Sequence, residues 1–154
     1  MQKVKDIMSS PAVSITGDIT IKEALDLLAD RNISGVPVVD SDDKVIGIIS
    51  DTDIIKYAHQ NSVVTHTNLS GWVSPYVDVN DLASVKKGFD RLATMKVGSV
   101  MTKKVFTINQ DADAGEAAKL MNRRNINRVP VIDNFDKLVG MVTRADIVKC
   151  MADL

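Results

Sequence analysis

Two short segments of the sequence carry a hydroxyl side chain followed three residues later by an aspartate: Ser50-x-x-Asp53 and Thr143-x-x-Asp146. Each hydroxyl residue ends an apolar run, so we expect it to close a strand and the aspartate to lie in the first turn of a helix. A helix N-terminus offers unpaired N–H groups and partial positive charge, which suit a phosphate, and a carboxylate can accept hydrogen bonds from both vicinal hydroxyls of a ribose. The alternative is a capping box, in which these side chains satisfy only their own helix.

Both segments belong to a repeat that covers most of the chain. Shifting the sequence by 93 positions aligns residues 4–58 with 97–151 without a gap, and 20 of the 55 aligned positions are identical. A match of this quality indicates two copies of one unit, joined by the connector 59–96.

Each copy predicts the order β-α-β-β-α. In the first copy we expect a strand over 12–15, a helix from Ile21 with Thr20 or Asp18 as N-cap, strands over 36–40 and 44–50, and a helix over about 51–58. The second copy predicts its first strand over 105–108 and its last helix over 144–151. Pro37 is expected to confine its strand to an edge or an entry position. A single copy is marginal in size, so we expect an α+β fold in which the two repeats pack as a pseudo-two-fold pair.

The connector predicts one helix, at about residues 80–96, from apolar residues at helical spacing after Asn80. Before it lies a loop that contains Trp72 and Tyr76. This loop either covers an exposed face of the module or contacts a partner or a second copy.

Composition excludes several classes of function. The net charge of −1 argues against a nucleic-acid partner. The first residues lack the apolar core of a signal peptide and the apolar runs are short, so we expect a cytoplasmic protein with no membrane partner. The lone Cys150 and the isolated His59 and His66 predict no metal site. We find no nucleophile–base–acid set, so we expect no enzyme.

The repeated Val-Pro-Val-Val/Ile-Asp strand, together with the segments Gly47–Asp53 and Gly140–Asp146, resembles the cystathionine-β-synthase (CBS) domain. A tandem pair of such domains is called a Bateman module. The resemblance implies a regulatory module that holds an adenosine-containing ligand, AMP, ADP, ATP or S-adenosylmethionine, in clefts between the repeats, with no required cofactor. It also implies a homodimer and an effector protein whose identity is unknown.

The same resemblance implies two sets of ligand-binding residues. In each cleft the base packs on the first strand and on the segment before the proline of one copy, and the other copy supplies the hydroxyl and the aspartate. The first cleft would join Ala12, Val13, Ser34, Gly35 and Val36 to Thr143, Arg144 and Asp146. The second would join Val105, Phe106, Asn127, Arg128 and Val129 to Ser50 and Asp53. The apolar members could instead belong to the ordinary core, and Phe106 could either stack on the base or fill its space.

The two copies differ in charge. Residues 4–58 carry ten acidic and five basic residues, whereas 97–151 carry six acidic and nine basic ones. Arg144 aligns with Asp51, and Arg128 aligns with Gly35. A guanidinium can clamp phosphate oxygens, although either arginine could simply be solvated, and Asp51 would repel a polyphosphate. We therefore expect tighter binding at Thr143 and Asp146. The alternative function is a dimerisation module whose clefts do not bind ligand.

Overall fold

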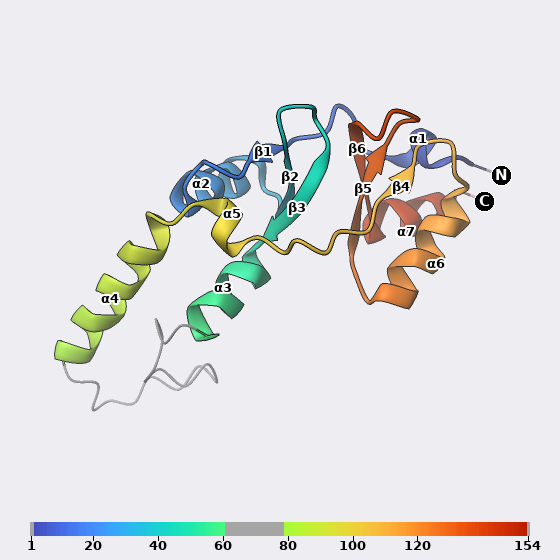
Figure 1. Ribbon diagram of the computed structural model, residues 1–154. Helices are drawn as coiled ribbons and strands as arrows, with labels where there is room; N and C mark the ends of the chain where they lie inside the picture. Colours follow the sequence, from blue (N-terminus) through green and yellow to red (C-terminus); the bar gives the residue numbers. More distant parts are fainter. Residues whose placement is uncertain (1, 61–78, 154) are drawn as a thin grey trace. The chain divides into compact units, whose positions relative to one another are not determined.

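The computed structural model describes residues 2–60 and 79–153, and Figure 1 shows the order of their elements. The helices are α1 (Val4–Ile7), α2 (Ile21–Arg31), α3 (Asp51–Gln60), α4 (Val79–Ala93), α5 (Val97–Val100), α6 (Ala114–Arg124) and α7 (Arg144–Ala152). The strands are β1 (Ile15–Thr16), β2 (Gly35–Val39), β3 (Val45–Ser50), β4 (Ile108–Asn109), β5 (Arg128–Ile132) and β6 (Leu138–Thr143). They form two three-stranded sheets, β1-β2-β3 and β4-β5-β6, which confirms the predicted α+β class. The loop that contains Trp72 and Tyr76 lies outside the described residues.

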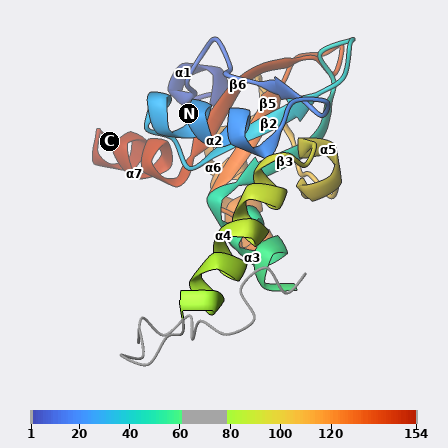
Figure 2. The same cartoon turned by 90° about the vertical axis from the view of Figure 1, so that its left-hand side faces the viewer.

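Contacts between backbone positions divide the chain into two units. The first unit comprises residues 1–15, 37–48 and 103–154, and the second comprises 16–36 and 49–102. Each unit therefore combines parts of both sequence repeats. In the second unit α3 packs against α4, as Figure 2 shows.

The short helix α1 ties the N-terminal segment to the second repeat within the first unit. Val4 is fully buried, and its N–H donates to the carbonyl of Ala112 at 2.9 Å. The ammonium group of Lys3 lies 2.7 Å from a carboxylate oxygen of Asp113. This hydrogen bond and the attraction between the charges raise the pKa of Lys3 and lower the pKa of Asp113.

The short helix α5 makes the matching connection in the second unit. The N–H groups of Val97 and Gly98 donate at 2.9 Å to the carbonyls of Ile19 and Gly17, in the first repeat. A Cβ on Gly98 would lie 3.2 Å from the Gly17 oxygen, so this close approach favours glycine. Neither α1 nor α5 is predicted by the sequence pattern, because their partners lie far away along the chain.

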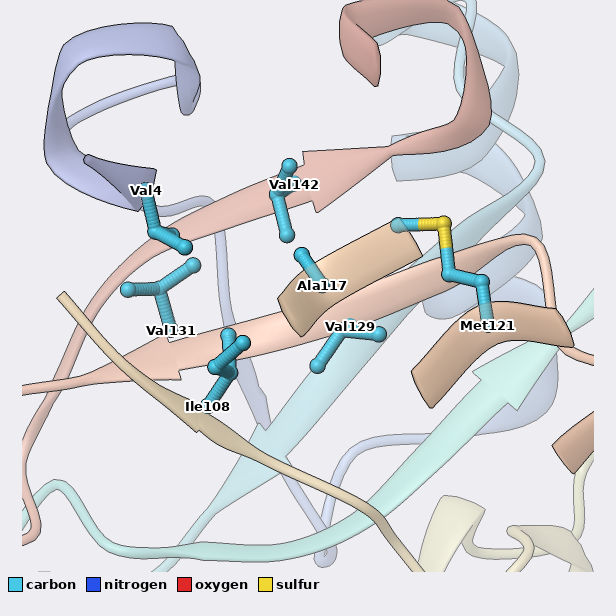
Figure 3. Packing of buried hydrophobic residues seen from close by; sticks show 7 residues of the cluster. All are labelled: Val4, Ile108, Ala117, Met121, Val129, Val131 and Val142. Atoms are coloured by element: carbon cyan, nitrogen blue, oxygen red, sulfur yellow. The ribbon is translucent and has the colours of Figure 1, made fainter. Parts of the chain in front are cut away.

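The core of the first unit lies between the sheet β4-β5-β6 and the helices α1 and α6, and Figure 3 shows its side chains pointing toward one another. β4 runs parallel to β5, and β5 runs antiparallel to β6. The seven buried members are Val4, Ile108, Ala117, Met121, Val129, Val131 and Val142. Strand alternation accounts for the pair Val129 and Val131, because residues two apart point to the same face of a sheet.

Two strand predictions need correction. The strands expected over 12–15 and 105–108 are only Ile15–Thr16 and Ile108–Asn109. The strand that contains Pro37 lies in the middle of its sheet, so of the two expected positions, an edge or an entry position, the edge is excluded. The aligned Pro130 explains how a proline is tolerated there. β4 pairs with β5 only at Val131 and Ile132, so Pro130 precedes the pairing with β4, although it is paired in register with Met141 of β6.

The predicted helices occur with small shifts at their ends. Thr20, one of two expected caps, is the N-cap of α2 and forms a capping box with Glu23. The Thr20 N–H and hydroxyl hydrogen-bond the Glu23 carboxylate, which lowers the pKa of Glu23. The connector helix α4 begins one residue before its expected start and ends three residues before its expected end.

Candidate functional site

The two Ser/Thr-x-x-Asp segments have the same local structure. Ser50 ends β3, and its N–H and hydroxyl both donate to Oδ2 of Asp53 at 2.9 Å. Thr143 ends β6, and its N–H and hydroxyl donate to Oδ2 of Asp146 at 2.7 and 2.8 Å. All four residues are half-buried. The capping box is therefore formed in both copies, and in each of them it uses only Oδ2 of the carboxylate.

The first turn of α3 is satisfied by the chain itself. The Asp51 N–H donates to the Ser34 carbonyl at 3.1 Å, and the Asp53 N–H donates to the Ser50 hydroxyl at 3.2 Å. The Thr52 N–H donates to the Asp51 carboxylate at 2.7 Å. This N-terminus thus presents a carboxylate where a phosphate would need a donor.

The first turn of α7 is more open. The Arg144 N–H donates to the Asn127 carbonyl at 2.9 Å, whereas the Asp146 N–H reaches the Thr143 hydroxyl only at 3.4 Å. Among the described residues of the first unit, no acceptor faces the Ala145 N–H. Arg144 itself is exposed at this helix end. The positive end of α7 therefore has both a backbone donor and a cation that an anion could use.

Asp53 has an additional partner that sequence reasoning missed. The hydroxyl of Thr102 donates to Oδ1 of Asp53 at 2.7 Å, and both residues belong to the second unit. Thr102 is exposed, whereas Asp53 is half-buried. The only signal in the sequence is that Thr102 aligns with Ser9, so both copies have a hydroxyl at this position.

In the second repeat the structure brings several of the predicted residues together. Arg128 is paired in register with Thr143 across β5 and β6, and the Asn127 carbonyl holds the first turn of α7. Arg128 and Thr143 are half-buried and Asn127 is exposed. Val129 is fully buried in the core, so its side chain is not accessible to a ligand.

In the first repeat Ser34 lines an open groove of about 430 Å³ between α2 and the start of α3. The groove wall also includes Leu25, Leu28 and Asp51. Gly35 is half-buried, and Val36, like its counterpart Val129, is fully buried. The Asp51 carboxylate makes this groove unfavourable for a phosphate.

The segments that precede β1 and β4 carry the residues predicted to pack on a base. Ala12, Val13, Val105 and Phe106 are all half-buried and lie outside the paired strands. A cation covers the Phe106 ring, because the Arg124 guanidinium carbon lies 4.4 Å from the ring centroid. The Lys104 ammonium group lies 5.9 Å from the same centroid. These are cation–π contacts, so a base that stacks on Phe106 has to share the ring with Arg124.

The structure also bears on metal sites and on membrane-spanning helices. Across residues 2–60 and 79–153, no group of three or more His, Cys, Asp or Glu side chains is arranged to hold a metal ion. In the same part of the chain, no helix combines the length and the apolar composition that crossing a membrane requires.

Comparison with known proteins finds the same repeat. The family model of the CBS domain matches residues 4–60 and 97–153, which confirms the resemblance of the tandem motifs. The CBS domain pair of protein MJ0100, solved in complex with 5′-methylthioadenosine and S-adenosyl-L-methionine, is 29% identical with a TM-score of 0.73, and the match covers 99% of this chain and 98% of that chain.

Two curated relatives come from Methanocaldococcus jannaschii. The uncharacterized protein MJ1426 is 34% identical over 96% of this chain and 90% of its own length. L-aspartate semialdehyde sulfurtransferase is 32% identical over 94% of this chain, but the match covers only 22% of the enzyme. The sequence therefore resembles both a protein of similar length and one part of a much longer enzyme.

Proposed function

The chain belongs to the CBS-domain family, and on that premise we propose that it is a regulatory module that binds an adenosine-containing ligand. The observation that carries this proposal is the arrangement at α7. There, among the described residues of the first unit, the half-buried Asp146 carboxylate accepts hydrogen bonds at Oδ2 only and the Ala145 N–H has no acceptor, and both lie beside the exposed Arg144. A ribose diol needs the Asp146 carboxylate as its acceptor, whereas a phosphate can bind the Ala145 N–H and the Arg144 guanidinium.

We assign the tighter binding to the Thr143 and Asp146 motif. The competing motif at Ser50 and Asp53 has its first-turn donors satisfied and a carboxylate, Asp51, in the position of Arg144. A phosphate is attracted by Arg144 at the start of α7 and repelled by Asp51 at the start of α3. The affinities of the two motifs should therefore differ most for the ligands that carry the most negative charge.

The ligand class follows from the adenosine that all candidates share. The related MJ0100 domain pair binds 5′-methylthioadenosine and S-adenosyl-L-methionine, which supports an adenosyl ligand for this chain. AMP, ADP and ATP carry the same adenosine and add the phosphate that Arg144 favours. Binding would bias the conformation of the module and change its contact with an effector protein, with no catalysis by the module itself.

A thermal-shift panel on refolded, ligand-free protein tests this function. The panel contains AMP, ADP, ATP, S-adenosylmethionine, 5′-methylthioadenosine and, as the control, GTP. A ligand present at about 100 times its dissociation constant stabilises the folded state by about 2.7 kcal/mol, which raises the melting temperature by roughly 5–10 °C. We expect such a shift with at least one adenosyl compound and none with GTP. Folded protein that shows no shift with any of them would contradict the proposal.

A second candidate function is an interaction module that acts by dimerisation without ligand. It is favoured by Ile55 on α3 and Val148 on α7, which occupy the same position of the repeat and are 58% and 60% exposed. α7 also exposes Met151, and none of its residues is buried. Apolar side chains at matching places on two helices are suited to burial against a second copy.

Light scattering on the purified chain tests the dimer. We expect twice the 16.8 kDa of one chain. Replacing Val148 by glutamate should shift the mass toward one chain, because a charge would be buried in the contact. The exposed neighbour Lys149, replaced by glutamate, is the matched control and should leave the dimer intact. A monomeric wild-type chain would argue against this function and against a homodimeric sensor.

A further inference from the structure

The hydrogen bond between Thr102 and Asp53 distinguishes Asp53 from Asp146, the aligned aspartate of the second repeat. Asp53 accepts the Ser50 N–H and hydroxyl at Oδ2 and the Thr102 hydroxyl at Oδ1, so both of its carboxylate oxygens are engaged. The Thr102 contact joins positions 49 residues apart. It is therefore not part of the local helix cap.

The aligned aspartate in the other repeat has no such partner in its own unit. Among the described residues of the first unit, all hydrogen bonds to the Asp146 carboxylate fall on Oδ2. Ser9, which aligns with Thr102, is held by its backbone, since its N–H and carbonyl pair with Met141 at 2.9 and 3.0 Å. Within the described residues of their own units, the two copies thus have the same capping box but differ in the hydrogen bonding of Oδ1.

The chemistry of this contact is that of a ribose hydroxyl. The Thr102 hydroxyl and a ribose hydroxyl are both neutral O–H donors. When a vicinal diol binds a carboxylate in a bidentate manner, one hydroxyl donates to each carboxylate oxygen. A ribose hydroxyl that binds Asp53 in this way competes with the Thr102 hydroxyl for Oδ1. The Thr102 hydroxyl can give way because its side chain is exposed and can turn to water.

We propose that Thr102 is an intrinsic competitor for the ribose at Asp53 and that it contributes to the lower affinity of this site. This inference rests on the proposed function, which it deepens by naming the residue that regulates one of the two motifs. The competitor lowers affinity for every ligand that carries a ribose diol, whatever its phosphate charge. It therefore acts separately from the repulsion by Asp51.

The test uses the full chain with Asp146→Ala in the background, which weakens the other motif, and adenosine as the probe in calorimetric titration. Thr102→Val removes the hydroxyl and keeps the side-chain volume. We expect it to tighten adenosine binding about fivefold, because the ribose no longer exchanges with a hydrogen bond inside the protein. Thr102→Ser keeps the hydroxyl and should give no gain, and neither should Ser9→Ala, the matched change in the other repeat.

A second probe separates competition from a general structural effect. With 2′,3′-dideoxyadenosine, which lacks the diol, Thr102→Val should bring no gain. Unchanged or weaker adenosine binding in Thr102→Val, or an equal gain with both probes, would overturn the inference and leave the proposed function standing. Failure of the wild-type chain to bind any adenosyl compound would overturn the proposed function first and this inference with it.

Discussion

Replacing Asp146 by alanine is expected to weaken the binding of an adenosyl ligand by about 1–3 kcal/mol, because the ribose hydroxyls lose the carboxylate that accepts their hydrogen bonds. The same change removes the capping box that Asp146 forms with Thr143, so the folded state should also lose stability. Calorimetric titration measures the first effect, and urea unfolding without ligand measures the second. The dissociation constant has to be taken at a temperature where the variant is fully folded.

A matched control exists in another helix of the same chain. Glu23 forms the corresponding capping box with Thr20 at the start of α2, and it lies outside both proposed motifs. Glu23→Ala should lower the free energy of unfolding to a similar degree and leave the dissociation constant unchanged. If both variants lost the same affinity, the loss would reflect the weakened helix cap, and Asp146 would have no role in the ribose contact.

The local parts of the fold could be predicted because their causes lie close together in the sequence. The spacing of Ser50 and Asp53, and of Thr143 and Asp146, correctly indicated strand–helix junctions with a capping geometry. Thr20 was one of two expected caps, and it has the residue three positions later, Glu23, that completes the box. Each of these features depends on side chains within one helical turn.

The features that escaped prediction depend on distant partners. α1 is held by Ala112, about a hundred residues further along the chain, and periodicity within a short window contains no such information. The hydroxyl of Thr102 on Asp53 and the guanidinium of Arg124 on Phe106 are likewise tertiary contacts. Only the repeat itself could have drawn attention to Thr102, through its alignment with Ser9.

These distant contacts matter for function because they make two similar motifs unequal. Sequence alone supports an asymmetry through charge, from Arg144 against Asp51. The structure adds an asymmetry in hydrogen bonding, since Oδ1 of Asp53 is engaged by Thr102. Charge would discriminate among ligands by their phosphates, whereas the hydroxyl would act on the ribose that all of them share.

Replacing Gly140 by alanine is expected to destabilise the folded state by about 1–3 kcal/mol, the usual cost of overpacking a tight site. A Cβ at this position would lie 2.9 Å from the carbonyl oxygen of Ser9 and would also strike the sulfur of Met8. The Met8 side chain could turn aside, but the Ser9 backbone is fixed by its two hydrogen bonds to Met141. The added methyl group therefore has to push the N-terminal segment away from β6. Urea unfolding followed by circular dichroism measures the loss.

Two further variants decide whether the Ser9 backbone is the cause. Gly115→Ala places the same methyl group in α6, where no heavy atom lies within 4 Å, and should leave stability unchanged or raise it by up to about 1 kcal/mol. In a Met8→Ala background the contact with sulfur is gone, whereas the contact with the Ser9 oxygen remains. Gly140→Ala should then still be destabilising. A full recovery in that background would show that the side chain of Met8 makes the site tight, and that the N-terminal segment can accommodate a methyl group against β6.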